Sequence, residues 1–406
     1  MSARKPGKPI VHPRALGLLT LVAVVAGGAT ARSVRAREAA RAAAVTLARS
    51  EDTRRRDADI AFFAGRVAAD PMGAADRSRL AALYLQRGRE TGDFEDYRRA
   101  ETLARRSLEL RVAHNARTYV VLASALLAQH RFTEALDVAR ALNARDPGVT
   151  ANQAVQAEVE LELGRYAEAR ALFDSLWPAR RDLAVAPRLA RWAEIRGDTG
   201  LARRLLAGAL ATARRRRDLP PEQLAWFYLR SGDYALRYGR LDEAAYALRA
   251  GLDVFPSDYR LLAAMARLAT ARGRWREAVR WGEEAISAVP DPAKFGVISD
   301  AYAALGDTVQ AAEYARAMEL AVLGQPGQWH RAWSLFLLDH DRRVPEVLAH
   351  VRAELVTRRD VYGYDLLAWA LHKSGRDGEA REAMATALAQ GTKDPQLLRH
   401  AGEILR

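Results

Sequence analysis

The histidines and carboxylates of this 406-residue chain are the first residues that could do chemistry. Three of the eight histidines, His330, His340 and His350, recur at ten-residue steps, and Asp339 and Asp341 flank the middle one. An Asp-His-Asp triplet carries oxygen and nitrogen ligands that suit a metal ion. We expect this triplet to form a turn between two helices instead. The ten-residue steps cross that turn, so the three histidines are not predicted to share a helix face.

The sequence contains no motif that would position a catalytic group or a cofactor. It has no phosphate loop, no G-x-S-x-G elbow, no H-E-x-x-H pair and no dinucleotide-binding fingerprint. It also has no cysteine, which excludes disulfides, thiol catalysis and cysteine-ligated metals. We therefore predict a protein that is not an enzyme, with no catalytic residues, no cofactor and no bound metal.

Aromatic and polar residues gather near the C-terminus. Residues 328–333 read Gln-Trp-His-Arg-Ala-Trp, residues 360–365 read Asp-Val-Tyr-Gly-Tyr-Asp, and Trp369 and His372 follow. Aromatic rings beside polar groups are common at binding surfaces. Two interpretations stay open: a ligand-binding patch, or aromatic residues that cover one end of the fold. An enzyme that uses this aromatic–histidine patch is the alternative from another functional class.

The chain is strongly basic. Its formal net charge is +13, and only five of its 63 basic residues are lysine, the rest being arginine. A positive charge of this size is typical of proteins that bind nucleic acid. The basic residues are, however, interspersed with acidic ones, as on a solvated helix face, and no nucleic-acid-binding motif accompanies them. We predict no nucleic-acid partner; an anionic envelope lipid or polymer is a better target for the positive field.

A short pattern recurs along the chain, mostly at intervals of 33 to 34 residues. It reads Gly-Arg, then an aromatic residue or Leu, and shortly afterwards Glu-Ala. One interval is longer, at 42 residues, and one copy is missing near Asp341. Clear copies begin at Gly164, Gly239, Gly273 and Gly375, and weaker ones at His130, Gly197 and Gly306.

Small residues accompany the copies at fixed distances. One lies seven residues before the turn glycine, and an alanine such as Ala278 or Ala311 lies five residues after it. Small residues let two helices approach closely, the glycine ends the first helix with a positive φ, and a proline ends several second helices. One helix pair cannot bury its own apolar face, so neighbouring pairs must stack. The small residues before the glycine are Gly232, Ala266, Ser299 and Ala368, and the prolines are Pro147, Pro256 and Pro290.

The period and these residues resemble the tetratricopeptide repeat. The resemblance implies an all-α fold: a right-handed superhelical solenoid of stacked antiparallel helix pairs, with about nine repeats. A C-terminal capping helix is expected at residues 394–406. The pairs are predicted at residues 76–110, 116–148, 150–178, 183–216, 225–256, 259–290, 292–322, 327–357 and 361–391.

The 42-residue interval divides the predicted solenoid. Its insertion contains four consecutive arginines, residues 214–217, and then Pro220 and Pro221, which stop any helix. It is either a longer loop in one continuous solenoid or a hinge between two parts.

The predicted organisation is a targeting segment at 1–31, a basic Ala-rich helix or spacer at 32–56, repeats at 57–216, a linker at 217–224, and repeats with the capping helix at 225–406. Residues 57–70 are expected to form a helix that packs on the first pair.

The N-terminus has the pattern of a targeting segment. Residues 1–14 carry four basic residues and no acidic one, an apolar run covers residues 15–31, and the run ends in Ala29-Thr30-Ala31. This order is typical of a secretory signal that is cleaved after Ala31. An uncleaved inner-membrane anchor is the alternative, since arginines at 32, 35, 37 and 41 oppose translocation. Either way we expect a periplasmic or otherwise extracytoplasmic protein, with membrane association through residues 15–31 in the second case.

In repeats of this kind the first helix of each pair lines the concave groove, and this resemblance selects the candidate binding residues. An arginine-lined groove suits an acidic peptide or a C-terminal carboxylate. The Lys and Asn set of the chaperone-binding members of the family has no match here, so a chaperone tail is not expected. The groove residues predicted are Arg188, Arg191, Arg230, Arg237, Arg260, Arg267, Arg331, Tyr362, Asp365, Trp369 and His372.

The function expected from the sequence is a non-catalytic scaffold of a bacterial cell envelope that binds a protein or peptide in its groove. An envelope assembly or secretion accessory factor is the alternative, and it differs only in its partner. Neither the partner nor the oligomeric state follows from the sequence, because repeat solenoids bind by shape and the fold does not fix the ligand.

Overall fold

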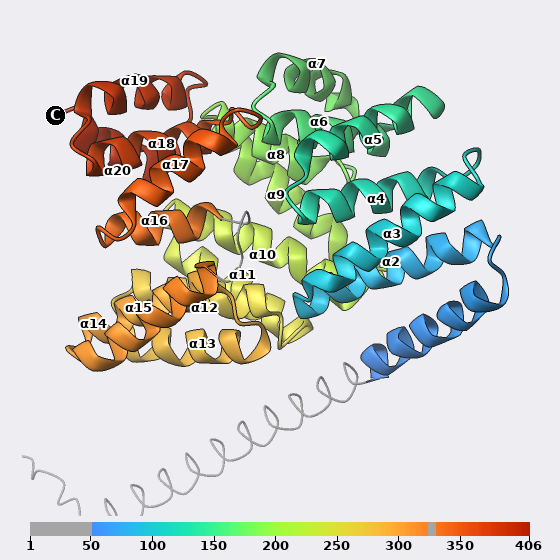
Figure 1. Ribbon diagram of the computed structural model, residues 1–406, viewed down its shortest axis with the longest axis horizontal. Coiled ribbons are helices and arrows are strands. Elements are labelled where there is room, and N and C mark those ends of the chain that lie inside the picture. Colours follow the sequence, from blue (N-terminus) through green and yellow to red (C-terminus); the bar gives the residue numbers. More distant parts are fainter. Residues whose placement is uncertain (1–50, 324–329) are drawn as a thin grey trace, which may run out of the picture. The chain divides into compact units, whose positions relative to one another are not determined.

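A computed structural model describes residues 51–323 and 330–406 of the chain (Figure 1). The predicted targeting segment at 1–31, and nearly all of the predicted spacer at 32–56, lie outside the described residues. Residues 55–406 form one compact unit. No helix of the described ranges combines the length and the apolar character that a membrane crossing requires.

The described part of the chain is all-α and contains no strand. Its helices follow one another as antiparallel pairs joined by short turns, as the repeat pattern predicts. The pairs are α2 Ala74–Thr91 with α3 Phe94–Leu110, α4 Ala116–Ala128 with α5 Phe132–Arg145, α6 Thr150–Glu162 with α7 Tyr166–Leu176, α8 Ala186–Ile195 with α9 Thr199–Ala213, α10 Pro221–Arg237 with α11 Leu241–Val254, α12 Tyr259–Ala271 with α13 Trp275–Ala288, α14 Pro292–Ala304 with α15 Thr308–Leu323, α16 Arg331–Asp339 with α17 Val344–Glu354, and α18 Val361–Lys373 with α19 Asp377–Leu388.

The ends of the solenoid are covered by helices from outside the pairs. Residues 55–69 are helical, and Ile60 is buried against Leu80 and Leu83 of α2. At the other end α20, Pro395–Ile404, packs on α18 and α19. A terminal repeat exposes an apolar face that no following repeat covers, and such caps remove that face from water.

The turns between paired helices use the glycines that the pattern singles out. Gly164, Gly197, Gly239 and Gly273 have φ between 66° and 76°, which costs glycine little. Two turns reach the same region without glycine: His130 has φ 59° and Asp341 has φ 53°. His340 and Asp341 lie in the predicted turn between α16 and α17, whereas Asp339 is the last residue of α16.

Small residues bring the paired helices together at the predicted positions. Ala278 and Ala285 of α13 are fully buried. A Cβ added to Gly232 would lie 2.6 Å from the Leu248 side chain, and one added to Gly282 would lie 2.5 Å from Ile298. The helices therefore approach as closely as these residues allow, and larger side chains would force them apart.

The insertion at the 42-residue interval does not separate the helices on its two sides. It spans residues 214–220, because α9 ends at Ala213 and α10 begins at Pro221. Ala209 and Ala213 of α9 are buried in one cluster with Phe227 of α10. The insertion is thus a loop between two helices that pack directly on each other.

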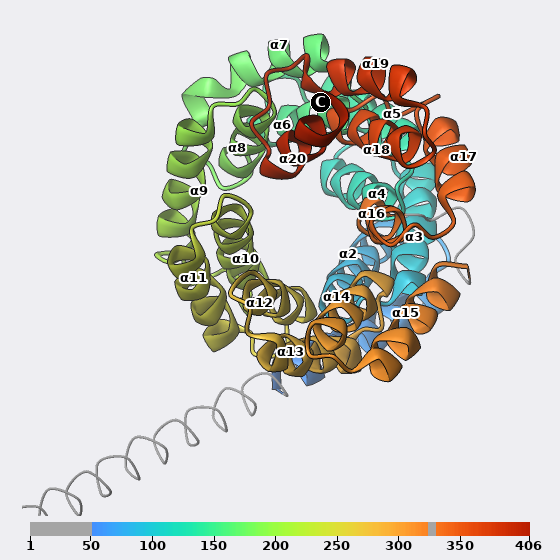
Figure 2. The same cartoon turned by 90° about the vertical axis from the view of Figure 1, so that its left-hand side faces the viewer.

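The C-terminal repeats lie against the middle of the solenoid (Figure 2). The backbone N–H of Arg359 donates to the Leu163 carbonyl at 3.0 Å, and that of Val361 donates to the Tyr166 hydroxyl at 2.7 Å. We call this contact, between residues 161–198 and residues 355–397, the seam. Its two sides are separated by nearly 200 residues of sequence.

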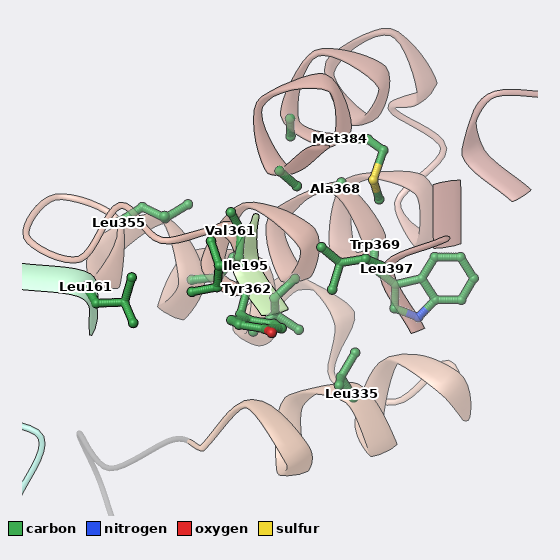
Figure 3. Close-up of a cluster of buried hydrophobic side chains, with 14 of the residues drawn as sticks. Leu161, Ile195, Leu335, Leu355, Val361, Tyr362, Ala368, Trp369, Met384 and Leu397 are labelled. Carbon is green, nitrogen blue, oxygen red and sulfur yellow. The ribbon is translucent and has the colours of Figure 1, made fainter. Parts of the chain in front are cut away.

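The seam has an apolar interior as well as these hydrogen bonds. One buried cluster contains residues of α6 to α9 together with residues of α15 to α20. Figure 3 shows Leu161 and Ile195 beside Val361 and Tyr362. At Gly164 and Gly197 backbone meets backbone, since an added Cβ would clash with the carbonyls of Arg359 and Gly391 respectively. The seam is thus part of the hydrophobic core of the unit.

A second long-range contact joins the first pair to the middle repeats. A Cβ on Gly92, in the α2–α3 turn, would lie 2.7 Å from the Val289 side chain that follows α13. Arg89 of α2 lies 3.7 Å from the Glu222 carboxylate of α10. The solenoid therefore contacts itself twice: the first pair meets residues of α10 and the segment after α13, and the C-terminal repeats meet residues 161–198 at the seam.

Replacing Ala278 with Leu should overpack the α12–α13 crossing and lower the free energy of unfolding by about 1–3 kcal/mol. Urea or thermal denaturation followed by circular dichroism measures this change. Ala288→Leu is the matched control, since Ala288 is exposed on the same helix and should change stability little. Equal stability of the two variants would contradict the packing described for α13.

Gly197→Ala should weaken the seam, whereas Gly239→Ala should not. Both glycines have φ above 70°, so alanine costs each turn about 1–2 kcal/mol. Only at position 197 does the new Cβ also meet another backbone, since nothing lies within 4 Å at position 239. Gly197→Ala should lose about a further 1–3 kcal/mol and increase the radius of gyration in small-angle scattering. An unchanged radius of gyration, with stability equal to Gly239→Ala, would show that the seam is not closed in solution.

Candidate binding channel

The inner face of the solenoid encloses three cavities that share their walls. Their volumes are about 600, 440 and 400 Å³. Asp233 lines the first and the second, Arg191 and Arg237 line the second and the third, and Arg331 and Gln396 line the third and the first. The three cavities therefore adjoin one another, and we call them together the channel. Its walls come mainly from first helices of the repeats, with Gln396 added by the capping helix.

Most of the arginines predicted to face the groove do line the channel. Arg188, Arg191, Arg230 and Arg237 lie around the second cavity, and Arg260, Arg267 and Arg331 around the first. Tyr362 lines the third cavity. The seam thus brings Tyr362, near the C-terminus, together with arginines of α8 and α10.

Most of these arginines are paired with carboxylates that the sequence did not single out. Arg188 donates to Glu158 at 2.8 Å, and Arg237 donates to Glu194 at 2.8 Å. In both pairs the carboxylate lies on the preceding first helix, one repeat earlier in the chain. Because helix pairs of a solenoid stack in register, an arginine on one first helix lies beside a carboxylate on the first helix of the preceding repeat.

The same pairing continues along the middle repeats. Arg267 of α12 donates to Asp233 of α10 at 2.7 Å. Arg260 donates to Asp258 at 2.6 Å and to Glu222 of α10 at 3.1 Å. Asp258 and Glu222 are buried, so removing Arg260 would leave Asp258 desolvated without an ion pair and Glu222 with Arg89 at 3.7 Å. These contacts hold neighbouring repeats together as well as lining the channel.

Arg191 takes its hydrogen bond across the seam. Its Nη1 donates to the Tyr362 hydroxyl at 2.8 Å, and its guanidinium carbon lies 4.5 Å from the centre of the Tyr362 ring. Glu162 is 4.0 Å away, at the limit of an ion pair. Burial raises the pKa of Tyr362, with Arg191 acting in the opposite direction. The phenol therefore stays neutral and contributes a dipole and a ring face to the channel.

Arg230 is the exception among the channel arginines. Among the described residues, its guanidinium has no ion pair and no hydrogen-bond acceptor, although it lines the second cavity. Burial lowers the pKa of Arg230, and repulsion from Arg237 lowers it further. A guanidinium remains charged even so. The channel thus holds a partly buried guanidinium that makes no ion pair with a described residue, although Glu194 and Asp233 attract it.

The sequence itself carries a family signature over part of these repeats. A family model described as a tetratricopeptide repeat matches residues 126–191. This match covers only a small part of the chain. With the helix pairs described above, it shows a solenoid of the tetratricopeptide-repeat type. No curated protein matches the sequence of the chain.

Several solved structures are similar to this chain. A tetratricopeptide repeat protein from Parabacteroides merdae is 13% identical, covers 72% of this chain and 99% of its own, and has a TM-score of 0.38. MamA MSR-1 is 17% identical, covers 42% of this chain and 95% of its own, and has a TM-score of 0.34. A human IFIT1 dimer with PPP-AAAA is 14% identical, covers 79% of this chain and 91% of its own, and has a TM-score of 0.44.

Two residues predicted for the groove, Asp365 and Trp369, are not open to the channel. They are 0% and 5% exposed because the capping helix α20 lies over them. The Trp369 ring stacks on His400 of α20 with 4.5 Å between ring centres. Asp365 accepts from His400 Nδ1 at 2.8 Å and from Arg331 at 2.5 Å. Asp365 and Trp369 thus cover the end of the solenoid, whereas Tyr362 of the same patch lines the channel.

The remaining histidines do not form a site together. His372 is bonded to Asp377 at 2.9 Å, and His340 is paired with Asp300 at 2.9 Å. His330 packs edge-on against His130, with ring centres 4.4 Å apart, and His350 lies 3.8 Å from Glu354. No group of three or more metal-ligating side chains occurs within residues 51–323 and 330–406. The histidines therefore serve separate helix contacts.

Asp365→Asn should destabilise the repeat protein far more than Asp377→Asn. Each aspartate is bonded to a histidine Nδ1, but Asp365 is fully buried beside Arg331 and Asp377 is half exposed. Removing the buried carboxylate should cost about 3–5 kcal/mol, and the exposed one at most about 1 kcal/mol. Thermal denaturation measures both changes. Equal effects would contradict the burial of residue 365 beneath α20.

Proposed function

We propose that this tetratricopeptide repeat protein is a non-catalytic scaffold that holds an acidic segment of a partner protein in its channel. The repeat fold is that of a protein-interaction scaffold and supports a protein partner. The channel supports the proposed position of the bound segment, since the walls of the channel are the concave faces of the repeats. The unpaired Arg230 supports the acidic character of the segment.

Arg230 is the main support for the proposal, because its guanidinium makes no ion pair and no hydrogen bond with a described residue. A partly buried charge without a counterion destabilises the folded protein. The other channel arginines offset this cost with carboxylates on neighbouring helices. A carboxylate from a bound segment would do the same for Arg230 and could contact Arg191, whose hydrogen-bond partner is a neutral phenol. An Asp or Glu side chain, or a chain end, has the required chemistry.

The cellular setting of the proposal comes from the N-terminal sequence. The basic segment, apolar run and small-residue exit of residues 1–31 support an exported protein of the bacterial envelope. A cleaved signal would release it to the periplasm, and an uncleaved one would anchor it to the inner membrane. N-terminal sequencing of the native protein separates the two, since cleavage after Ala31 gives a chain that begins at Arg32. An uncleaved protein in the cytosol would overturn the envelope setting.

Binding of fluorescein-labelled hexaglutamate, followed by fluorescence anisotropy, tests the proposed function. The unmodified protein should bind the peptide, and added salt should weaken binding because exposed charges are screened over about 8 Å at physiological ionic strength. Arg230→Gln should weaken binding about 10-fold to 100-fold, from the roughly 1.5–3 kcal/mol of a charge-assisted hydrogen bond. It should lower the melting temperature little, because Arg230 makes no ion pair and no hydrogen bond with a described residue and is only attracted by Glu194 and Asp233.

Arg249→Gln is the matched control, since Arg249 is exposed on the second helix of the same repeat. It should leave hexaglutamate binding unchanged. Absence of binding to the unmodified protein, or equal binding by Arg230→Gln, would overturn the acidic-segment proposal.

A further inference from the structure

The first and largest cavity of the channel differs from the arginine-rich part by its apolar floor. Val297 of α14, and Leu335 and Phe336 of α16, form this floor. Ala263 of α12 and Ala332 of α16 lie beside them, and their small side chains leave the space open. The volume of about 600 Å³ falls within the roughly 300–1,000 Å³ of pockets that hold small ligands.

Most of the basic groups around this floor are held in ion pairs, and the buried Lys294 is held by a backbone carbonyl. Arg267 is paired with Asp233, and His340 with Asp300. The Lys294 amine donates to the Val289 carbonyl at 2.7 Å. What the cavity offers a ligand besides these groups is apolar surface, and burying such surface favours binding.

The apolar cavity and the Arg230 cavity are neighbours. Asp233 of α10 forms part of both walls, and Arg230 lies one helical turn before it on the same helix. One bound segment can therefore place a carboxylate on Arg230 and an adjacent side chain over Leu335 and Phe336. Because the seam closes one side of the channel, we expect such a segment to be extended rather than a folded domain.

We propose that the channel selects a segment with two features: an acidic residue for Arg230 and, next to it, a bulky apolar side chain such as Leu, Met or Phe for the Ala332 cavity. This inference rests on the proposed function and adds a second specificity element to it. The acidic residue alone would not distinguish one partner from the many acidic segments of a cell. The apolar side chain would, because it must fit a defined floor.

Panning a phage-displayed random peptide library on the full chain tests the inference. The selected peptides should share an acidic residue and a bulky apolar residue at a fixed spacing. Within one selected peptide, replacing the apolar residue by Ser should weaken binding at least tenfold, and replacing the acidic residue by its amide should do the same. These changes are made in the peptide, so protein folding does not affect the outcome.

Ala332→Trp provides the matching change in the protein, since it fills the apolar cavity from an exposed position on α16. It should weaken the same peptide at least tenfold. Ala211→Trp is the control, because Ala211 is exposed on α9, a second helix that lines none of the three cavities. It should leave binding unchanged.

The outcomes separate the two proposals. Peptides that share only acidic residues and bind equally to Ala332→Trp would overturn the apolar element and leave the acidic-segment function standing. Peptides that share only apolar residues and bind Arg230→Gln normally would overturn the acidic-segment function and, with it, the paired motif. A library that yields no enriched peptide would overturn both.

Discussion

Backbone lies against backbone where the C-terminal repeats meet the middle of the solenoid, and the inner face of the protein depends on that contact. Gly164 and Gly197 each approach a carbonyl of the opposite side so closely that a Cβ would clash. Leu161 and Ile195 then share an apolar core with Val361. Without this seam Tyr362 would not reach Arg191, and the third cavity would lack one wall. An open groove becomes a channel because two distant parts of one chain are complementary.

The same closure changes what the net charge of the protein means. A formal charge of +13 suggests a basic inner surface, yet most channel arginines are matched by carboxylates such as Glu158, Glu194 and Glu222. Arginine suits this arrangement because its planar fork can bind two acceptors at once, as Arg260 does with Asp258 and Glu222. Among the described residues, the positive charge in the channel that makes no ion pair is therefore local, at Arg230 and Lys294, rather than spread over its wall.

The repeat pattern predicted the fold well because everything that defines a repeat is local in sequence. The turn glycines, the small residues such as Gly232 and Ala278, and the capping helix all follow from spacing within one repeat or its neighbour. The seam could not be predicted in this way. It depends on the curvature accumulated over several repeats, and no residue such as Gly391 or Tyr362 carries a sign of its distant partner.

The candidate site shows the same division between local and long-range information. Counting along a helix placed Arg188, Arg230 and Arg237 on the inner face, since helical periodicity is enough for that. Counting could not show that Asp365 and Trp369 would be covered, because the cover is a separate helix, α20, whose docking is tertiary. It also missed the carboxylate partners, although an acidic residue at an inner position one repeat earlier, such as Glu158 before Arg188, was a readable signal.

Closure also explains why an unpaired arginine can be retained. In an open groove, water would solvate the Arg230 guanidinium, and an acidic ligand would gain little by replacing that water. Inside a channel the guanidinium is partly desolvated even before a ligand arrives, so part of the cost of removing water is carried by the folded protein. A carboxylate that enters then recovers that cost as binding energy in a medium of lower dielectric constant. The seam and the repeat core stabilise the fold. This stability allows the protein to keep the Arg230 guanidinium without an ion pair, so that a carboxylate of a partner can bind it.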